Sequence, residues 1–384
     1  MLVRAQDPTG HLEAIMLHTD IPTRGEVQAL AAATDPWCVS IYTPTEADTA
    51  TPDQNRIAFS NQARTVLDLV TDADARAALE EEFDDLIDDE EFWRYQSRTL
   101  IVHATPSRIR TYRVPNQLGA AETVGERFYL KPLLRTITFP QSAFVLALAE
   151  GSVRLVQVSA DRPAQEVKLA NLPSSAADYA RKASLSDRAP KRRVQGDEGS
   201  KMRVRQYSRA IDAELRTILS GRDVPLILAA AEPTDSLYRS VNSYDGLLDE
   251  SIPGNPEHLS DQELADRSRE ILDRHYVAQL AELAGLLDKR RSEGRASTDI
   301  ADLARAATFG NVDTLLVDID AAVPGTISPD DGAVTFDAPS DTETPGILDE
   351  ICRRVLLSGG RVLAVRAADM PGGAQIAGIF RYAA

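Results

Sequence analysis

The chain has 384 residues, of which 43% are hydrophobic and 26% charged, and its formal net charge is -17 at pH 7. This length is too great for one core, so we expect two or three domains, and no apolar run approaches the roughly 18 residues that cross a bilayer. The N-terminal residues lack the apolar stretch of a secretion signal, and the only cysteines, Cys38 and Cys352, lie too far apart in sequence to suggest a disulfide framework or a zinc site; we therefore expect a cytoplasmic protein without a cofactor.

The first third of the chain mixes strand patterns with helix patterns. Alternating and β-branched residues predict strands at 37–45 and within 99–114, and apolar residues at helical spacing predict helices at 55–70 and 76–91. Residues 123–137 are expected to lead out of this region. We place an N-terminal α/β domain at residues 1–138.

The middle third begins with a strongly apolar pattern. Residues 144–159 predict a hairpin around a Glu-Gly turn, 166–173 a third strand, 174–202 a long polar loop, and 225–233 a buried strand that a short helix follows. Between the loop and that strand, Val204, Tyr207, Ile211, Leu215 and Ile218 recur at helical spacing and predict an amphipathic helix that ends at Gly221. This pattern predicts a compact α/β domain over residues 139–272.

The last third predicts a layered α/β/α domain at residues 273–384. Ser260 and Glu263 form a capping box that opens a long helix running to about Arg291. The elements predicted after it are a helix at 298–310, a strand at 312–319, an acidic hairpin or loop at 324–346, a helix at 347–360, and strands at 361–367 and 375–382. A tight glycine turn at 371–375 is expected to join the last two strands as a hairpin.

One segment stands out against the acidic background. Residues 181–205 hold nine Lys or Arg and three Asp or Glu, a local charge of +6 in a chain of -17. Arginine forks pair with phosphates, and screening limits repulsion from distant carboxylates to about 8–10 Å. The sequence therefore predicts a basic, glycine-containing loop that contacts RNA.

Catalytic and metal-binding signatures are missing from the sequence. We find no phosphate-binding loop, no nucleophile elbow and no HExxH motif, and the five histidines do not fall at ligand spacing. The run at 80–91 has nine acidic residues in twelve; it is interpreted as a solvated helix face, with a docking surface for a basic partner as the alternative.

The order of these features resembles the bacterial archaeo-eukaryotic release factor-like (baeRF) families, which are related to class-1 peptide chain release factors and Pelota. A basic, glycine-containing loop lies between an N-terminal domain and a C-terminal α/β/α domain, and it leads into an amphipathic helix. The segments that carry the resemblance are 39–45, 144–159, 199–215, 307–318 and 359–382.

The resemblance implies a ribonuclease H-like middle domain and a C-terminal domain resembling kink-turn-binding ribosomal proteins. In such factors the loop carries a Gly-Gly-Gln tripeptide, whereas this loop offers Gln195, Gly196 and Gly199 at its tip without forming that tripeptide. No Asn-Ile-Lys-Ser motif for stop-codon reading is found either. The implied function is binding to the ribosomal A site in rescue, hibernation or stress protection, without codon-specific release. The implied rRNA contacts are Lys191, Arg192, Arg193, Lys201, Arg203, Arg205 and Arg209.

Other functions stay open at this point. A peptidyl-tRNA hydrolase would use Gln195 in a rearranged loop, a nuclease would use clustered carboxylates of the middle domain, and a protein adaptor would bind through acidic surfaces. A translational GTPase is left open as a further partner, and the oligomeric state is not determined by the sequence.

Overall fold

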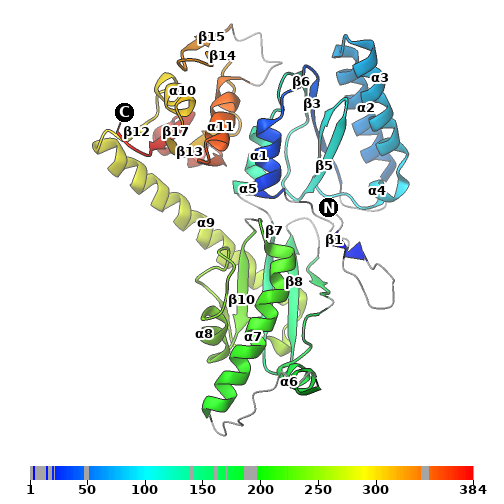
Figure 1. Cartoon of the computed structure of the whole chain (residues 1–384), viewed down its shortest axis with the longest axis vertical. Helices are drawn as coiled ribbons and strands as arrows, with labels where there is room; N and C mark the ends of the chain where they lie inside the picture. Colours follow the sequence, from blue (N-terminus) through cyan, green and yellow to red (C-terminus); the bar gives the residue numbers. More distant parts are fainter. Residues whose placement is uncertain are drawn as a thin grey trace. The chain divides into compact units, whose positions relative to one another are not determined.

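The structure, a computed structural model, groups the chain into two compact units. Unit 1 comprises Met1–Leu17 and Gln141–His275, and unit 2 comprises His18–Pro140 and Tyr276–Ala384 (Figure 1). The division into three domains stays a prediction. The residues that the structure describes are 3–4, 14–15, 20, 22–46, 52–138, 142–159, 163–169, 171–185, 197–222, 224–338 and 346–383.

Unit 1 is built on a mixed five-stranded sheet. Its strands are β7 (Ser142–Leu148), β8 (Val153–Ser159), β9 (Gln165–Val167), β10 (Leu226–Ala230) and β11 (Ile252–Pro253), in the order β11-β10-β7-β8-β9. β7 and β8 pair antiparallel as the predicted hairpin, whereas β10 runs parallel to β7. Every residue of β7 is buried, as expected for a strand with a neighbour on each side. Two short strands, β1 (Val3–Arg4) and β2 (Ala14–Ile15), pair separately.

The helices of unit 1 correct one prediction. They are α6 (Ala176–Leu185), α7 (Asp197–Leu219), α8 (Thr234–Arg239), the 3-10 turn η1 (Pro256–His258) and the first part of α9 (Asp261–Ser292). The segment expected to be loop at 174–202 thus contains α6 and the first turns of α7. The prediction was wrong because no apolar period marks this polar segment as helical. Its Ala, Lys, Arg, Met and Glu residues nevertheless have high helix propensity. The capping box that begins α9 is confirmed, since the Glu263 carboxylate accepts from Ser260 N and Oγ, both at 2.8 Å.

Unit 2 contains a four-stranded antiparallel sheet near its N-terminal end. Its strands are β3 (Cys38–Pro44), β4 (Thr99–Thr105), β5 (Arg108–Val114) and β6 (Ala121–Gly125), in the order β5-β4-β3-β6. The helices around it are α1 (Arg24–Ala32), α2 (Pro52–Leu69), α3 (Ala73–Asp88), α4 (Glu90–Arg94) and α5 (Lys131–Thr138). Side chains of α2, α3 and α4, including Phe59, Phe83 and Trp93, pack on one face. Leu30 of α1 and Leu133 of α5 pack on the other.

A second four-stranded sheet in unit 2 has the predicted α/β/α layering. Its strands are β12 (Ala296–Ser297), β13 (Val312–Asp318), β16 (Arg361–Val365) and β17 (Ile376–Phe380), in the order β12-β17-β13-β16. Leu303 of α10 (Ile300–Thr308) and Ile351 of α11 (Ile347–Leu357) pack against one face, and Leu283 and Leu287 of α9 pack against the other. A hairpin of β14 (Gly325–Ile327) and β15 (Val334–Phe336) lies in the acidic segment.

The turn at 371–375 is confirmed, but the hairpin expected there is wrong. Gly372 and Gly373 adopt φ values of 64° and 69° within two short 3-10 turns, η2 (Ala367–Asp369) and η3 (Pro371–Gly373), which explains the glycines. The strands on either side, β16 and β17, do not pair with each other. Both pair with β13, which lies between them.

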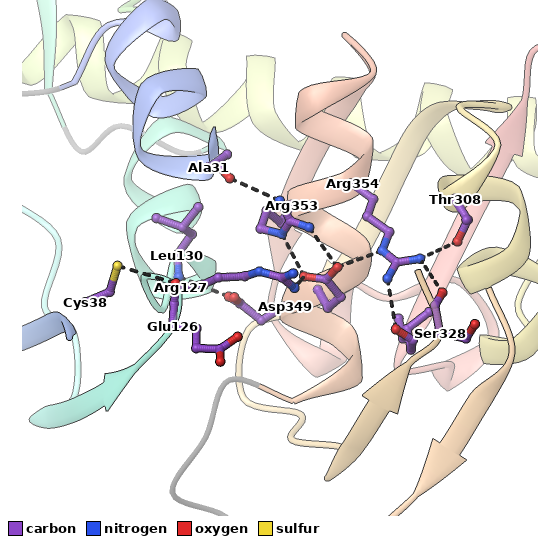
Figure 2. Close-up of polar contacts among 12 residues, drawn as sticks. Ala31, Cys38, Glu126, Arg127, Leu130, Thr308, Ser328, Asp349, Arg353 and Arg354 are labelled. Atoms are coloured by element: carbon purple, nitrogen blue, oxygen red, sulfur yellow. Dashed lines mark hydrogen bonds and ion pairs between the residues drawn. The ribbon is translucent and has the colours of Figure 1, made fainter. Parts of the chain in front are cut away.

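Polar contacts within unit 2 join α11 to the segment that precedes α5 (Figure 2). The Asp349 carboxylate accepts from Leu130 N at 3.0 Å and from Lys131 N at 2.9 Å, and it thereby caps the start of α5. Glu350 accepts from Arg127 at 2.6 Å and from Arg353 and Arg354, each at 2.7 Å. These contacts fix the first sheet's elements against those of the second.

Three further findings concern the sequence-based exclusions. Cys38 and Cys352 are both free and buried. Among the described residues, no helix is long and apolar enough to cross a membrane. Within the same residues, no group of three or more His, Cys, Asp or Glu side chains is placed to hold a metal ion.

Candidate nucleic-acid interface

The basic segment leads into α7, and the buried face of this helix is the one predicted from the sequence. Tyr207, Ile211, Leu215 and Ile218 are each at most 3% exposed, and Val204 is also buried. Burying such apolar side chains stabilises a helix by roughly 1.5–3 kcal/mol for each large side chain. The hydrophobic stripe therefore fixes which side of α7 faces the unit and which side faces solvent.

Polar contacts fix the same orientation. The Asp212 carboxylate, 6% exposed, accepts from Ser243 N at 2.9 Å and from Ser243 Oγ at 2.8 Å. Glu214 Oε1 accepts from Asn171 N at 3.2 Å. Because these partners lie on separate segments of unit 1, they resist rotation of α7 about its axis.

The exposed arginines of α7 lie in two different directions around the helix axis. Arg205, Arg209 and Arg216 fall within about 40° of one another around the helix axis, at about 100° per residue, and they span about 16 Å of its length. We call these three residues the arginine row. Arg203 is also exposed, but it lies about 160° around the axis from Arg205. The predicted contacts Arg203, Arg205 and Arg209 therefore do not share one face.

The partners of the arginine row differ along the helix. Arg216 Nε lies 3.6 Å from Asp212 Oδ2, and the Arg216 side chain is 56% exposed. Within the described part of the chain, Arg205 and Arg209 form no ion pair with another residue. Because exposed ion pairs contribute only about 0–1 kcal/mol, all three guanidinium groups can turn to an external phosphate.

The other predicted site residues are placed only in part. Lys191, Arg192, Arg193, Gln195 and Gly196 lie outside the described residues, as does the side chain of Lys201. Gly199 lies in the first turn of α7 rather than at a loop tip, which corrects that prediction.

Sequence comparison assigns a family to one segment of the chain. Residues 140–278 match bacterial archaeo-eukaryotic release factor family 11. This match confirms the predicted resemblance, and we call these residues the family 11 segment. No curated protein matches the chain.

Several solved structures are similar to the chain at low identity. The archaeal translation termination factor aRF1 is 16% identical, with 94% of this chain and 99% of that chain covered and a TM-score of 0.25. Archaeoglobus fulgidus Pelota is 12% identical, with coverages of 99% and 98% and a TM-score of 0.29. S. cerevisiae Dom34, described as a translation termination-like factor that interacts with Hbs1, is 10% identical, with coverages of 95% and 94% and a TM-score of 0.40.

The family 11 segment contains the whole five-stranded sheet of unit 1 and all of α7. The arginine row thus lies within the only segment that the family match covers. Its chemistry is that of a cation surface, because guanidinium groups donate hydrogen bonds and carry charge but exchange no protons near neutral pH. The arrangement suits phosphate recognition rather than acid-base catalysis.

Proposed function

We propose that this protein is a ribosome-associated, release factor-like protein and that the family 11 segment contacts rRNA phosphates through α7. The observation that carries the proposal is the arginine row, three exposed cations aligned on an anchored helix in a chain of net charge -17. The match to a release factor family is the reason for proposing rRNA as the RNA that is bound.

The anchoring of α7 supports recognition of RNA over solubilisation. An exposed charge that serves only solubility gains nothing from a fixed position, whereas phosphate contacts weaken when the cations can move. Asp212 and Glu214 hold α7 by hydrogen bonds to other segments, so the backbone positions that carry the three arginines stay on the exposed side of the helix.

The finer proposal follows the family resemblance. The middle domain is ribonuclease H-like, the C-terminal domain resembles kink-turn-binding ribosomal proteins, and the protein occupies the A site in rescue, hibernation or stress protection. A translational GTPase is a second proposed partner. The proposal includes no codon-specific release, since residues 194–199 read VQGDEG, which lacks the Gly-Gly-Gln tripeptide, and the sequence has no Asn-Ile-Lys-Ser motif.

The proposal is tested by sedimenting the protein with bacterial ribosomes across a salt series. The triple variant Arg205→Gln, Arg209→Gln, Arg216→Gln removes the arginine row. If each arginine releases the counterions of one phosphate, the slope of log affinity against log salt becomes shallower by about 2, at about 0.7 per phosphate of a single strand.

A matched control removes three cations elsewhere in the family 11 segment. Arg267, Arg269 and Arg274 lie on α9, and the side chains of the last two are 43% and 56% exposed. Their triple replacement by Gln changes the net charge equally, so both variants would lose the same affinity if net charge alone governed binding. We expect the control to bind like the wild type. Equal binding by the two triple variants would overturn the assignment of α7.

The enzymatic alternative has its own test. A peptidyl-tRNA hydrolase acting through the loop would lose activity on Gln195→Ala, whereas the proposed binding function would keep ribosome association. Equal peptide release by the wild type and this variant removes the glutamine from any mechanism.

A further inference from the structure

A row of polar residues crosses the N-terminal sheet of unit 2. The strand register places Thr123 of β6 opposite Ser40 of β3, and Ser40 opposite His103 of β4. It also places His103 opposite Arg110 of β5. Side chains on one face of a sheet are cross-strand neighbours, so the four residues form a polar band on the face that Leu30 and Leu133 otherwise pack with apolar contacts.

A cavity lies at this polar band, between α1 and the β4–β5 hairpin. Its volume is about 220 Å³, and its lining includes Glu26, Leu30, His103, Arg108, Arg110 and Phe128. This volume exceeds the space of several waters, at about 30 Å³ each, and suits a molecule of a few heavy atoms. Arg108 is exposed, so the cavity is reached from the hairpin end.

His103, one of the lining residues, carries an unsatisfied donor. Its side chain is 1% exposed, and burial lowers its pKa to about 3, so the imidazole is neutral at pH 7. Ser40 Oγ accepts from Tyr129 N at 2.9 Å and lies 3.2 Å from His103 Nδ1. A hydroxyl that already accepts is completed by donating, so Ser40 donates to Nδ1 and the proton of the ring stays on Nε2.

The buried Nε2–H then has no partner among the described residues, and neither has the hydroxyl of Tyr112, another residue that lines the cavity. Leaving a buried polar group unsatisfied costs about 1–3 kcal/mol. Two such groups on residues that line one cavity offer hydrogen bonds to a bound ligand.

The charged groups of the cavity decide the chemistry of that ligand. Glu26 Oε2 is taken up by the capping box of α1, where it accepts from Thr23 N and Oγ1, each at 2.9 Å. Asp35 Oδ1 accepts from Trp37 N at 2.9 Å. Arg110 lies 3.9 Å from Glu26, beyond hydrogen-bond distance, and its side chain is 42% exposed. One oxygen of each carboxylate is therefore committed, and Glu26 Oε1 forms only a long ion pair with Arg110. The His103, Tyr112, Arg108 and Arg110 side chains of the lining supply more free donors than these carboxylates supply free acceptors.

We propose that this cavity binds a small oxyanion, a phosphate or a carboxylate, through His103 Nε2–H and the Arg110 guanidinium. The Tyr112 hydroxyl donates a third hydrogen bond. The site is independent of the arginine row, because it lies in unit 2 and outside the family 11 segment. It would make this sheet a binding module for a small anionic ligand.

The test is a titration of the full chain followed by NMR of the histidine ring nitrogens. Sodium phosphate and sodium succinate are the two probes, each against sodium chloride at matched ionic strength. The His103 resonance is assigned by its loss in His103→Phe. We expect a saturable shift of the Nε2 resonance at concentrations up to about 10 mM of at least one probe, and the probe that binds identifies the oxyanion.

Arg110→Gln tests the cation without removing a buried group. We expect its dissociation constant for the bound probe to rise about tenfold, as loss of one charged hydrogen bond implies. The control is Arg76→Gln, which removes an exposed cation that pairs with Asp68 at 2.9 Å elsewhere in unit 2. Failure of both probes to saturate, or equal binding by Arg110→Gln and the wild type, would overturn the proposal.

Discussion

Glu350 offers the sharpest test of how unit 2 is held together. Its side chain is 13% exposed and accepts from three arginines, of which Arg353 and Arg354 are 14% and 11% exposed and Arg127 is 39% exposed. Glu350→Gln keeps the shape and removes the charge, which leaves three guanidinium groups facing one another. Solvent screens the Arg127 pair to within about 1 kcal/mol, so the two buried pairs dominate, and we expect unfolding to become easier by about 3 kcal/mol.

Tryptophan fluorescence makes this measurement specific. The chain has two tryptophans, Trp37 and Trp93, and both belong to unit 2. Urea unfolding followed by their emission therefore reports on unit 2. Glu122→Gln is the matched control, because Glu122 is exposed and accepts from Gln62 at 2.8 Å; it should change the unfolding free energy by about 0.5 kcal/mol or less. A loss below about 1 kcal/mol for Glu350→Gln would refute the argument from arginine repulsion.

The same fluorescence assay checks three further predictions. Burial raises the pKa of Asp349 from 3.8 to about 6, so its stabilising contribution is lost as pH rises from about 4 to 6. In Asp349→Asn the amide oxygen can accept the same two backbone hydrogen bonds. The unfolding free energy of this variant should exceed that of the wild type at pH 8 and lose this advantage below pH 4. Burial lowers the pKa of His103 to about 3 from 6.5, so the wild type should lose about 2 kcal/mol relative to His103→Phe between pH 6.5 and 5. Gly332 has φ of 74° and a new Cβ would lie 2.7 Å from Arg305 Cα, whereas Gly372 has φ of 64° and open space; Gly332→Ala should therefore cost over about 2 kcal/mol and Gly372→Ala about 1 kcal/mol.

Much of the fold could be predicted because its signals are local. The apolar face of α7, the hairpin of β7 and β8, and the capping box at Ser260 each depend on residues a few positions apart. The loop expected at 174–202 was wrong for a local reason too. Its charged residues are good helix formers, but without an apolar stripe no period marks them as helical.

The errors and omissions elsewhere share a different cause. β16 and β17 follow each other in sequence, which favours a hairpin, but β13 lies between them, and only packing of the whole sheet decides this. The polar band needs His103 to meet Ser40, which lies 63 residues earlier in the chain. No pattern within either strand shows that pairing, so His103 looked like one structural histidine among five. The candidate cations could be predicted from their charge. Their separation onto two faces of α7 could not, because it depends on the helix beginning before Arg203, at Asp197.

The charge contrast of the chain has a consequence for RNA binding. Counterion release makes binding by the arginine row weaken as salt rises, whereas the acidic remainder repels RNA most strongly at low salt, where screening is weakest. These two effects have opposite signs, so the total slope with salt should be shallower than the number of phosphate contacts implies. Removing the arginine row deletes the first effect and slightly strengthens the second. The difference in slope between the triple variant and its α9 control is therefore the quantity that counts contacts, because both variants share the same change in net charge.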